Sequence, residues 1–233
     1  MEHMYELKNT DTIISPSLIY YEEIIRENIK KAIRTAGSPE RLWPHVKSHK
    51  SKDMVRMQME YGITKFKTAT VAEAEMAAEA GAEKVILAYP LIGPNMERFV
   101  KLAKAYPDTV FYGVEDDLAQ FEALSGVCVE HDAVLPTLVD VNMGMNRTGV
   151  PIERLEELYR SASSLPGLRL CGMHCYDGNH NNKDAAVRQA EVDDTDKKVW
   201  DIMERLNAGV SLFIIIQDKP GHISIPCPDF HLC

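Results

Sequence analysis

The sequence has little of what would place a protein in a membrane or outside the cell. Its longest apolar run, 210–216, is broken by Ser211 and is far shorter than the roughly 20 residues that cross a bilayer. The N-terminal segment MEHMYELKNT has neither a basic start nor an apolar stretch, so it predicts no secretory signal. Five cysteines among 233 residues are too few for a disulfide scaffold. We therefore expect a cytoplasmic protein that does not enter a membrane.

Basic residues are also in the minority. The chain has 26 Lys plus Arg against 35 Asp plus Glu, which gives a net charge of −9. Binding to a phosphate backbone needs clustered Lys and Arg, so this balance argues against a nucleic-acid partner. The hydrophobic fraction of 45% and the charged fraction of 26% are ordinary for a globular protein. The length fits one large domain or two small ones, in the size range of an enzyme.

What the sequence does have is a regular alternation of short apolar runs and amphipathic segments. Such an alternation predicts βαβ units with a parallel sheet. An open doubly wound sheet fits less well, because no G-x-G-x-x-G follows the first apolar run. We therefore predict a (β/α)8 barrel, whose chemistry lies at the carboxyl ends of its strands. The predicted strands are 43–46, 65–70, 85–89, 110–114, 134–141, 168–176 and 212–216. The predicted helices include 71–81, 95–106, 116–130, 151–163 and 184–206.

The predicted barrel is incomplete. Seven strands do not close an eight-stranded barrel, although Ser15–Tyr20 could supply another strand before the first helix. After residue 216 the pattern stops, since residues 217–233 contain three prolines and no periodicity. We divide the chain into a lead-in (1–14), a barrel domain (15–216) and an irregular tail (217–233). We hypothesise that the tail is read in a different frame or follows a truncation.

The densest polar cluster is PHVKSHK, residues 44–50, at the end of the first predicted strand. A lysine there can be partly desolvated, which lowers its pKa and makes its amine a carbonyl nucleophile. His45 and His49 could tune Lys47 or move protons. Spacing alone also fits, and slightly favours, a basic surface loop that opens a helix.

A second cluster, NMGMNRTG at 142–149, follows the strand predicted at 134–141. Its two glycines allow close backbone approach, and Arg147 between them could contact an anion. A turn with a solvated arginine is the alternative, and it is slightly favoured by spacing alone.

A third cluster, GMHCYDGNH, covers residues 172–180. Alternation along a strand places His174 and Tyr176 on one face, with Met173 and Cys175 on the other. By the same alternation Cys171 and Cys175 share a face, where buried free thiols are the simplest explanation.

Together these motifs resemble those of the pyridoxal-phosphate barrel family that includes alanine racemase, and most closely its D-threonine aldolase and D-serine dehydratase branch. PHVKSHK is similar to the P-H-x-K-[ST]-H-K element of that branch, DVNMGMNRTG to its G-M-x-R-x-G element, and GMHCYDGNH to its G-x-x-x-Y-x-G-H segment. The segments TATVAEAEMAAEAG and ILAYPLIGP also fit. The resemblance extends over 15–216 and implies a barrel of the alanine racemase N-terminal kind.

The resemblance also implies a pyridoxal 5′-phosphate cofactor and roles for individual residues. Lys47 would carry the cofactor as a Schiff base, and Arg147 would lie near its phenolic oxygen. His174 would flank the pyridine ring, and Tyr176 would help to hold the cofactor or the substrate. Lys47 and His174 would then be the catalytic residues, and the substrate would be a small D-amino acid. The conjugated ring accepts the electrons released at Cα.

The implied activity is that of a lyase of the D-threonine aldolase type, which converts D-threonine into glycine and acetaldehyde. A D-serine dehydratase-like lyase is the nearest alternative. A non-catalytic pyridoxal-phosphate-binding protein of vitamin homeostasis is another, favoured by the length but not by the form of the lysine motif. A fragment that binds nothing is a third. Family members are commonly dimeric with the second domain at the interface, so the resemblance leaves a homodimer open.

Two functional parts of the family are missing from the sequence. The Gly-Gly-Thr loop that holds the cofactor phosphate is expected where Gln217, Asp218 and Lys219 stand. The branch uses a divalent metal as a Lewis acid, but its ligands belong to a C-terminal β domain that this sequence lacks. No residue is therefore assigned to a metal. A structural zinc site has four ligands, so we interpret the spacing of Cys227, His231 and Cys233 as coincidence. The chain is accordingly expected to be a catalytically incomplete version of the lyase.

Overall fold

A computed structural model describes residues 5, 7, 9–206 and 211–215 of the chain, the last of these as backbone only. The strands are β1 (Lys65–Thr68), β2 (Lys84–Leu87), β3 (Val110–Glu115), β4 (Leu135–Asn142), β5 (Leu168–Tyr176) and β6 (Ser211–Ile215). The α-helices are α1 (Glu22–Ala36), α2 (Lys52–Met59), α3 (Val71–Glu79), α4 (Pro94–Ala105), α5 (Leu118–Glu130), α6 (Ile152–Ala162) and α7 (Ala185–Leu206). Short 3-10 turns are η1 (Thr10–Thr12), η2 (Pro39–Arg41) and η3 (Val46–Ser48).

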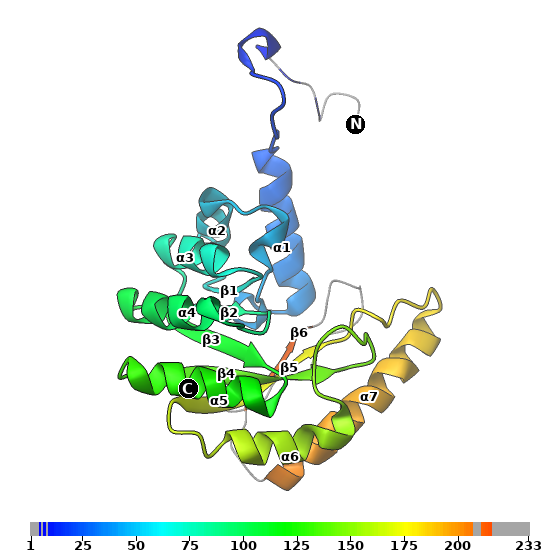
Figure 1. The fold of residues 1–233 in the computed structure, drawn as a ribbon. Helices are drawn as coiled ribbons and strands as arrows, with labels where there is room; N and C mark the ends of the chain where they lie inside the picture. Colours follow the sequence, from blue (N-terminus) through cyan, green and yellow to red (C-terminus); the bar gives the residue numbers. More distant parts are fainter. Residues whose placement is uncertain (1–4, 6, 8, 207–210, 216–233) are drawn as a thin grey trace.

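The strands form one parallel sheet in chain order, β1 to β6, and a helix connects each strand to the next. Helices α3 to α7 lie outside the curved sheet (Figure 1). Their sequences explain where they begin: Thr70, for example, accepts a hydrogen bond at its Oγ1 from the Glu73 N–H and caps α3. Pro151 is the residue that precedes α6 rather than part of its first turn. The predicted α/β barrel, open and incomplete, is confirmed.

Two of the predicted strands are wrong. Residues 43–46 make only a single parallel bridge, between His45 and Lys67, because Pro44 has no N–H to donate and η3 begins at Val46. Ser15–Tyr20 is not a strand, since it lies in the segment before α1 that projects away from the other elements (Figure 1). The predicted strand 212–216 corresponds to β6, with residue 216 and the predicted tail 217–233 outside the described residues.

The sheet has two buried faces with separate cores. Alternate strand residues such as Val85, Val139 and Met173 pack with the helices in the larger cluster. The residues between them form a second, separate cluster on the opposite, inner face of the sheet. This inner apolar cluster consists of Ile86, Tyr112, Val114, Leu138 and Cys171. Both faces of the sheet therefore have buried side chains, as expected for a parallel sheet.

A β-bulge in β5 decides which side chains reach the inner face. Thr137 pairs with Leu170, but the next residue, Leu138, pairs with Gly172, so Cys171 is the extra residue. Gly172 has a φ of 138°, a conformation that favours glycine. The alternation therefore changes phase at Cys171, which turns inward while Cys175 faces the helices. The prediction that these two cysteines share a face is wrong for this reason.

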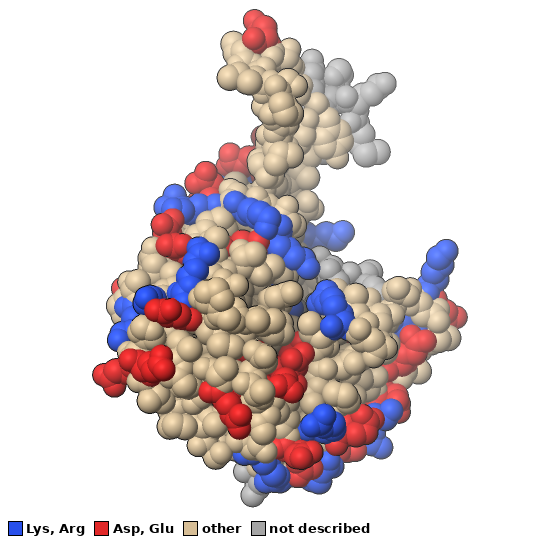
Figure 2. All heavy atoms as spheres, in the orientation of Figure 1, with Lys and Arg blue, Asp and Glu red and all other residues tan. Residues whose placement is uncertain are grey.

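The helical surface carries charges of both signs. On the face shown in Figure 2, acidic and basic side chains are interspersed and form no continuous basic patch. Several are paired along single helices, such as Lys101 with Glu97 and Lys198 with Asp194. None of the helices in the described part of the chain is long and apolar enough to cross a membrane.

Candidate active site

The loop that carries Lys47 is attached to the first strand of the sheet. The Lys67 N–H donates to the Pro44 carbonyl at 3.0 Å, next to the bridge between His45 and Lys67. Within η3, the backbone N–H of Lys47 donates to Nδ1 of His45 at 3.2 Å. The Lys47 side chain is exposed, so the partial burial predicted for it is not found. Its amine makes no hydrogen bond or ion pair with any described residue.

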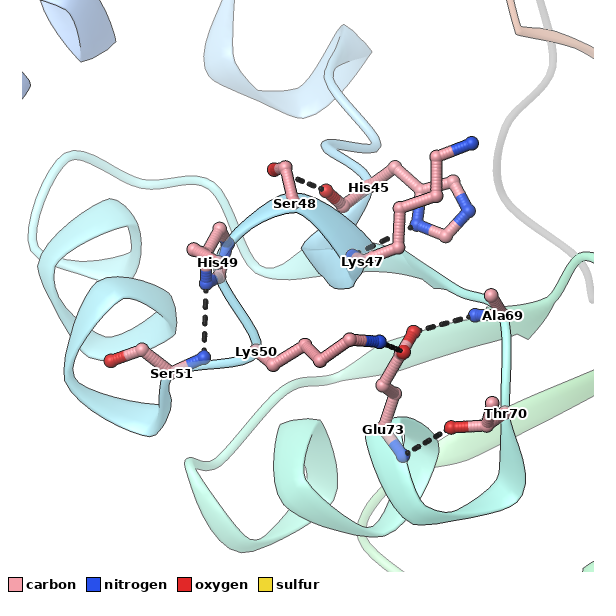
Figure 3. A network of polar contacts seen from close by, with 9 residues as sticks. All are labelled: His45, Lys47, Ser48, His49, Lys50, Ser51, Ala69, Thr70 and Glu73. Atoms are coloured by element: carbon pink, nitrogen blue, oxygen red, sulfur yellow. Dashed lines mark hydrogen bonds and ion pairs between the residues drawn. The ribbon is translucent and has the colours of Figure 1, made fainter. Parts of the chain in front are cut away.

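The second lysine of the motif has a different environment. Lys50, in a left-handed conformation with φ 48°, forms an ion pair with the buried carboxylate of Glu73. Glu73 also accepts a hydrogen bond from the Ala69 N–H at 2.8 Å, which ties the loop to the start of α3. Figure 3 shows the Lys47 side chain pointing away from this network, alongside the His45 ring. Of the two lysines, Lys47 has the amine available for chemistry.

The loop after β4 is built around Asn142. Its Oδ1 accepts hydrogen bonds from the N–H groups of Gly144 and Asn146, at 3.0 and 3.1 Å. Gly149 has a φ of 100°, and a Cβ there would lie 2.4 Å from the Asn142 nitrogen, so only glycine fits. The Gly149 N–H also donates to an Asp116 carboxylate oxygen at 2.7 Å. This closed loop presents Arg147, whose guanidinium lies 5.1 Å from the centre of the Tyr176 ring.

A buried His–Asp pair lies between β4 and β5. Asp140 and His174 are register partners, and His174 Nδ1 lies 2.6 Å from Asp140 Oδ1. Burial, reinforced by the charge of Lys67, lowers the pKa of His174 although Asp140 opposes the shift. A neutral ring that donates Nδ1–H to Asp140 keeps its lone pair on Nε2. That buried Nε2 has no hydrogen-bond partner among the described residues.

Lys67, on β1, is a buried cation in the same region. Its ammonium lies 5.3 Å from the centre of the Tyr176 ring. Burial lowers its pKa to about 8, the charges of Lys47 and Arg147 act in the same direction, and Asp140 opposes them. The neighbouring His45 has its pKa lowered to about 4, first by burial and then by Lys47 and Lys67, so it is neutral at pH 7.

The structure therefore places all four predicted site residues, Lys47, Arg147, His174 and Tyr176, around Lys67. His174 and Tyr176 share the inner face, as the alternation predicts. The sequence reasoning missed Lys67 and Asp140. The signal for both was a charged residue inside an otherwise apolar strand, which is unusual unless the charge has a function or a partner.

Two cavities differ in their relation to these residues. A larger one, of about 400 Å³, lies at the amino-terminal end of β5 and between α6 and α7, away from Lys47 and His174. Barrel chemistry lies at the opposite ends of the strands, so we assign it no function. A smaller one, of about 10 Å³, is lined by Asp140, Val141, Asn142, Met143, Met145, Arg147, Thr148 and Tyr176.

These residues fit an anionic aldehyde such as pyridoxal phosphate. Lys47 offers an amine without a partner among the described residues, His174 offers a buried unpaired Nε2, and Lys67 and Arg147 offer positive charge. Residues 217–219, where the phosphate loop is expected, lie outside the described residues. No group of three or more His, Cys, Asp or Glu that could hold a metal occurs within 9–206 or the other described positions.

Comparison with solved structures identifies similar folds. The D-threonine aldolase from Filomicrobium marinum is 27% identical, with 84% of this chain and 54% of that chain covered and a TM-score of 0.75. The D-threo-3-hydroxyaspartate dehydratase from Delftia sp. HT23 is 19% identical, with 86% and 55% covered and a TM-score of 0.75. An alanine racemase from Clostridium difficile 630, in complex with cycloserine, is 11% identical, with 82% and 52% covered and a TM-score of 0.67.

The chain thus spans about half the length of the solved structures that it matches. No curated protein matches it. The family of the alanine racemase N-terminal domain matches residues 22–210, which include every strand and helix from α1 to α7. The chain therefore belongs to the family defined by the alanine racemase N-terminal domain.

Proposed function

We propose that the protein is a pyridoxal-phosphate-dependent lyase that acts on D-amino acids, with D-threonine aldolase activity as the first candidate. The observation that carries this proposal is the Lys47 amine, which has no partner among the described residues while Lys50 is ion-paired to Glu73. The family implies the cofactor, and the 27% identity to a D-threonine aldolase supports the aldolase over other reactions. Because the chain covers 54% of that structure, activity of this chain by itself is part of the proposal.

In the proposed reaction Lys47 would hold the cofactor through its aldehyde, and Lys67, Arg147 and Tyr176 would lie near it. When bound, the cofactor supplies a conjugated ring that accepts the electron pair released at Cα of the substrate. His45, neutral at pH 7, accepts the Lys47 backbone N–H at Nδ1 and holds η3 in place. These residues would position and retain the cofactor, and the proton transfer is assigned to His174.

His174 is the proposed proton acceptor. Its Nδ1–H is held by Asp140, so its Nε2 lone pair is available for the β-hydroxyl proton of the substrate. Loss of that proton allows the Cα–Cβ bond to break, which releases acetaldehyde from D-threonine. The Cα left behind would then take up one proton, which balances the proton that His174 accepted, and glycine would be released. The Asp140 carboxylate stabilises the imidazolium that His174 becomes during this transfer.

The test begins with attachment of the cofactor. The purified chain is incubated with pyridoxal phosphate, reduced with borohydride and digested, and the modified lysine is located by mass spectrometry. We expect modification at Lys47, its loss in Lys47→Ala, and its retention in the matched control Lys50→Ala. Modification at Lys50 instead would contradict the assignment.

The second stage separates the candidate activities. Glycine and acetaldehyde from D-threonine would support the aldolase, whereas pyruvate and ammonia from D-serine would support a dehydratase. Attachment at Lys47 without turnover of either substrate would support a binding protein or an incomplete enzyme. Sedimentation of the same preparation tests whether the chain forms a homodimer.

A further inference from the structure

Lys67 is a charged side chain without the partner that its burial requires. Only 5% of its surface is exposed, and its ammonium forms no hydrogen bond or ion pair with a described residue. Its backbone is fixed by the bonds to Pro44 and His45, so the side chain stays on the inner face. Asp140, the carboxylate whose charge acts most strongly on Lys67, is engaged by His174. A buried ammonium is costly unless an opposite charge compensates it.

A second cation increases the imbalance. Arg147 and Lys67 lie 5.1 and 5.3 Å from the centre of one ring, that of Tyr176. Cation–π contacts stabilise each of them modestly, but the charge of the exposed Arg147 acts against the buried charge of Lys67. The charged groups that act on Lys67 are Lys47 from η3, Asp140 from β4, Arg147 from the loop after β4, and Asp177 at the end of β5.

We propose that Lys67 and Arg147 together form an oxyanion-binding subsite, with the Tyr176 ring as its wall. The small cavity lined by Arg147, Tyr176 and Asp140 holds about 10 Å³, close to the space of one water-sized oxygen. Arg147 and the Tyr176 ring line this cavity, and Lys67 lies beside the same ring from the buried strand β1. An anionic oxygen beside that ring would compensate both cations.

The identity of the ligand rests on the proposed function. Three anionic oxygens come with it: the phenolate of the cofactor, its phosphate, and the carboxylate of the D-amino acid. All three share the chemistry of a charge-assisted hydrogen bond to nitrogen donors. They differ in which part of the ligand must be present for the loss of the Lys67 charge to weaken binding.

The experiment uses ligands that cannot bond to Lys47. Pyridoxine 5′-phosphate has an alcohol in place of the aldehyde, and pyridoxine in addition lacks the phosphate. Binding of each, and of D-threonine, is measured by titration calorimetry with the wild-type chain, Lys67→Met and the control Lys65→Met. Lys65 lies on the same strand but donates to the Glu40 carbonyl at 2.8 Å, outside the pocket.

We expect Lys67→Met to weaken binding of at least one probe by tenfold or more, with Lys65→Met within twofold of wild type. A loss for both pyridoxine and its phosphate ester indicates the phenolate, a loss for the ester alone indicates the phosphate, and a loss for D-threonine alone indicates the carboxylate. Lys67→Arg, which keeps the charge, should recover part of the affinity.

Equal affinities in Lys67→Met and Lys65→Met, or no binding of any probe to the wild-type chain, would overturn the subsite. If Lys67→Met does not fold by circular dichroism, Lys67→Gln is the second variant. None of these probes has an aldehyde, so none of them depends on a bond to Lys47. A wrong assignment of Lys47 would therefore show in the borohydride experiment and leave the comparison of Lys67→Met with Lys65→Met unchanged.

Discussion

The inner face of the sheet contains two clusters that contrast in polarity. The inner apolar cluster, Ile86, Tyr112, Val114, Leu138 and Cys171, is an ordinary hydrophobic core. The polar cluster, Lys67, Asp140, His174 and Tyr176, lies on the same face of neighbouring or identical strands. The register shows how close they are, since Lys67 pairs with Ile86 on β2, and Leu138 and Asp140 are alternate residues of β4.

The contrast shows how the fold prepares ionisable groups for chemistry. Apolar neighbours exclude water, and the charged form of a group then becomes less favourable. The pKa of Lys67 falls to about 8 and that of His174 falls as well, both chiefly by burial. The exposed Lys47 is close enough for its charge to act on Lys67. The pKa values of the polar cluster therefore depend on burial by apolar neighbours. Mutations can alter the residues of each cluster separately.

The largest effect is expected when the apolar cluster is broken. Leu138→Ala removes a fully buried side chain and should lower the free energy of unfolding by about 2–5 kcal/mol, through lost burial and a cavity. Urea denaturation measures the loss. The control Val134→Ala, at a position that is 61% exposed, should change stability by less than about 0.5 kcal/mol. Equal effects would contradict the assignment of Leu138 to a packed core.

Breaking the polar cluster should cost less stability but change its titration. Asp140→Ala leaves the buried Nδ1 of His174 without its acceptor, which should lower the free energy of unfolding by about 1–3 kcal/mol. The hydrogen bond to Asp140 raises the pKa of His174, so its removal should lower that pKa further. Urea denaturation and an NMR titration of the ring measure both. Asp53→Ala, with a side chain that is 90% exposed, is the control. An unchanged His174 titration would contradict the pairing.

The smallest effect concerns Glu115, at the end of β3. Burial, with the charges of Asp116 and Asp140, raises its pKa to about 8, although the Leu91 N–H opposes the shift. Between pH 6 and 7 the folded protein therefore keeps a proton that the unfolded chain has lost, so this group makes the fold less stable as pH rises. Glu115→Gln removes that dependence. From pH 6 to pH 7 the free energy of unfolding of the variant should therefore rise by about 1 kcal/mol relative to that of wild type. Parallel stability curves for the two proteins would contradict the raised pKa.

The sequence was sufficient for most of the fold. Six of the seven predicted strands correspond to β1–β6, and the helices 71–81, 95–106, 116–130 and 184–206 correspond to α3, α4, α5 and α7. Three of these helices are preceded by a residue whose side chain caps them, namely Thr70 before α3, Asp117 before α5 and Asp184 before α7. The segment 43–46 was misread because an apolar run followed by a motif resembles a strand, while its pairing depends on long-range contacts that Pro44 limits.

The candidate site was predictable only where chemistry and spacing coincide. Lys47 and Arg147 lie in loops with recognisable motifs, and alternation placed His174 and Tyr176 on one face. Lys67 and Asp140 gave only the weak signal of a charge within a strand, because their proximity depends on the strand order. The contrast between Lys47 and Lys50 also needed the structure, since Glu73, which engages Lys50, comes from a different helix.

The bulge at Cys171 has a consequence for how β5 tolerates mutation. Up to Leu170, even-numbered positions pack against the helices, and from Met173 onward the odd-numbered positions do so. In a strand of the same length without the bulge, one alternation would continue past Leu170 and would place His174 and Tyr176 against the helices, with Met173 and Cys175 on the inner face. The strand would keep its composition and lose its pocket. The tolerance of β5 therefore depends on Gly172, whose φ of 138° at the bulge favours glycine.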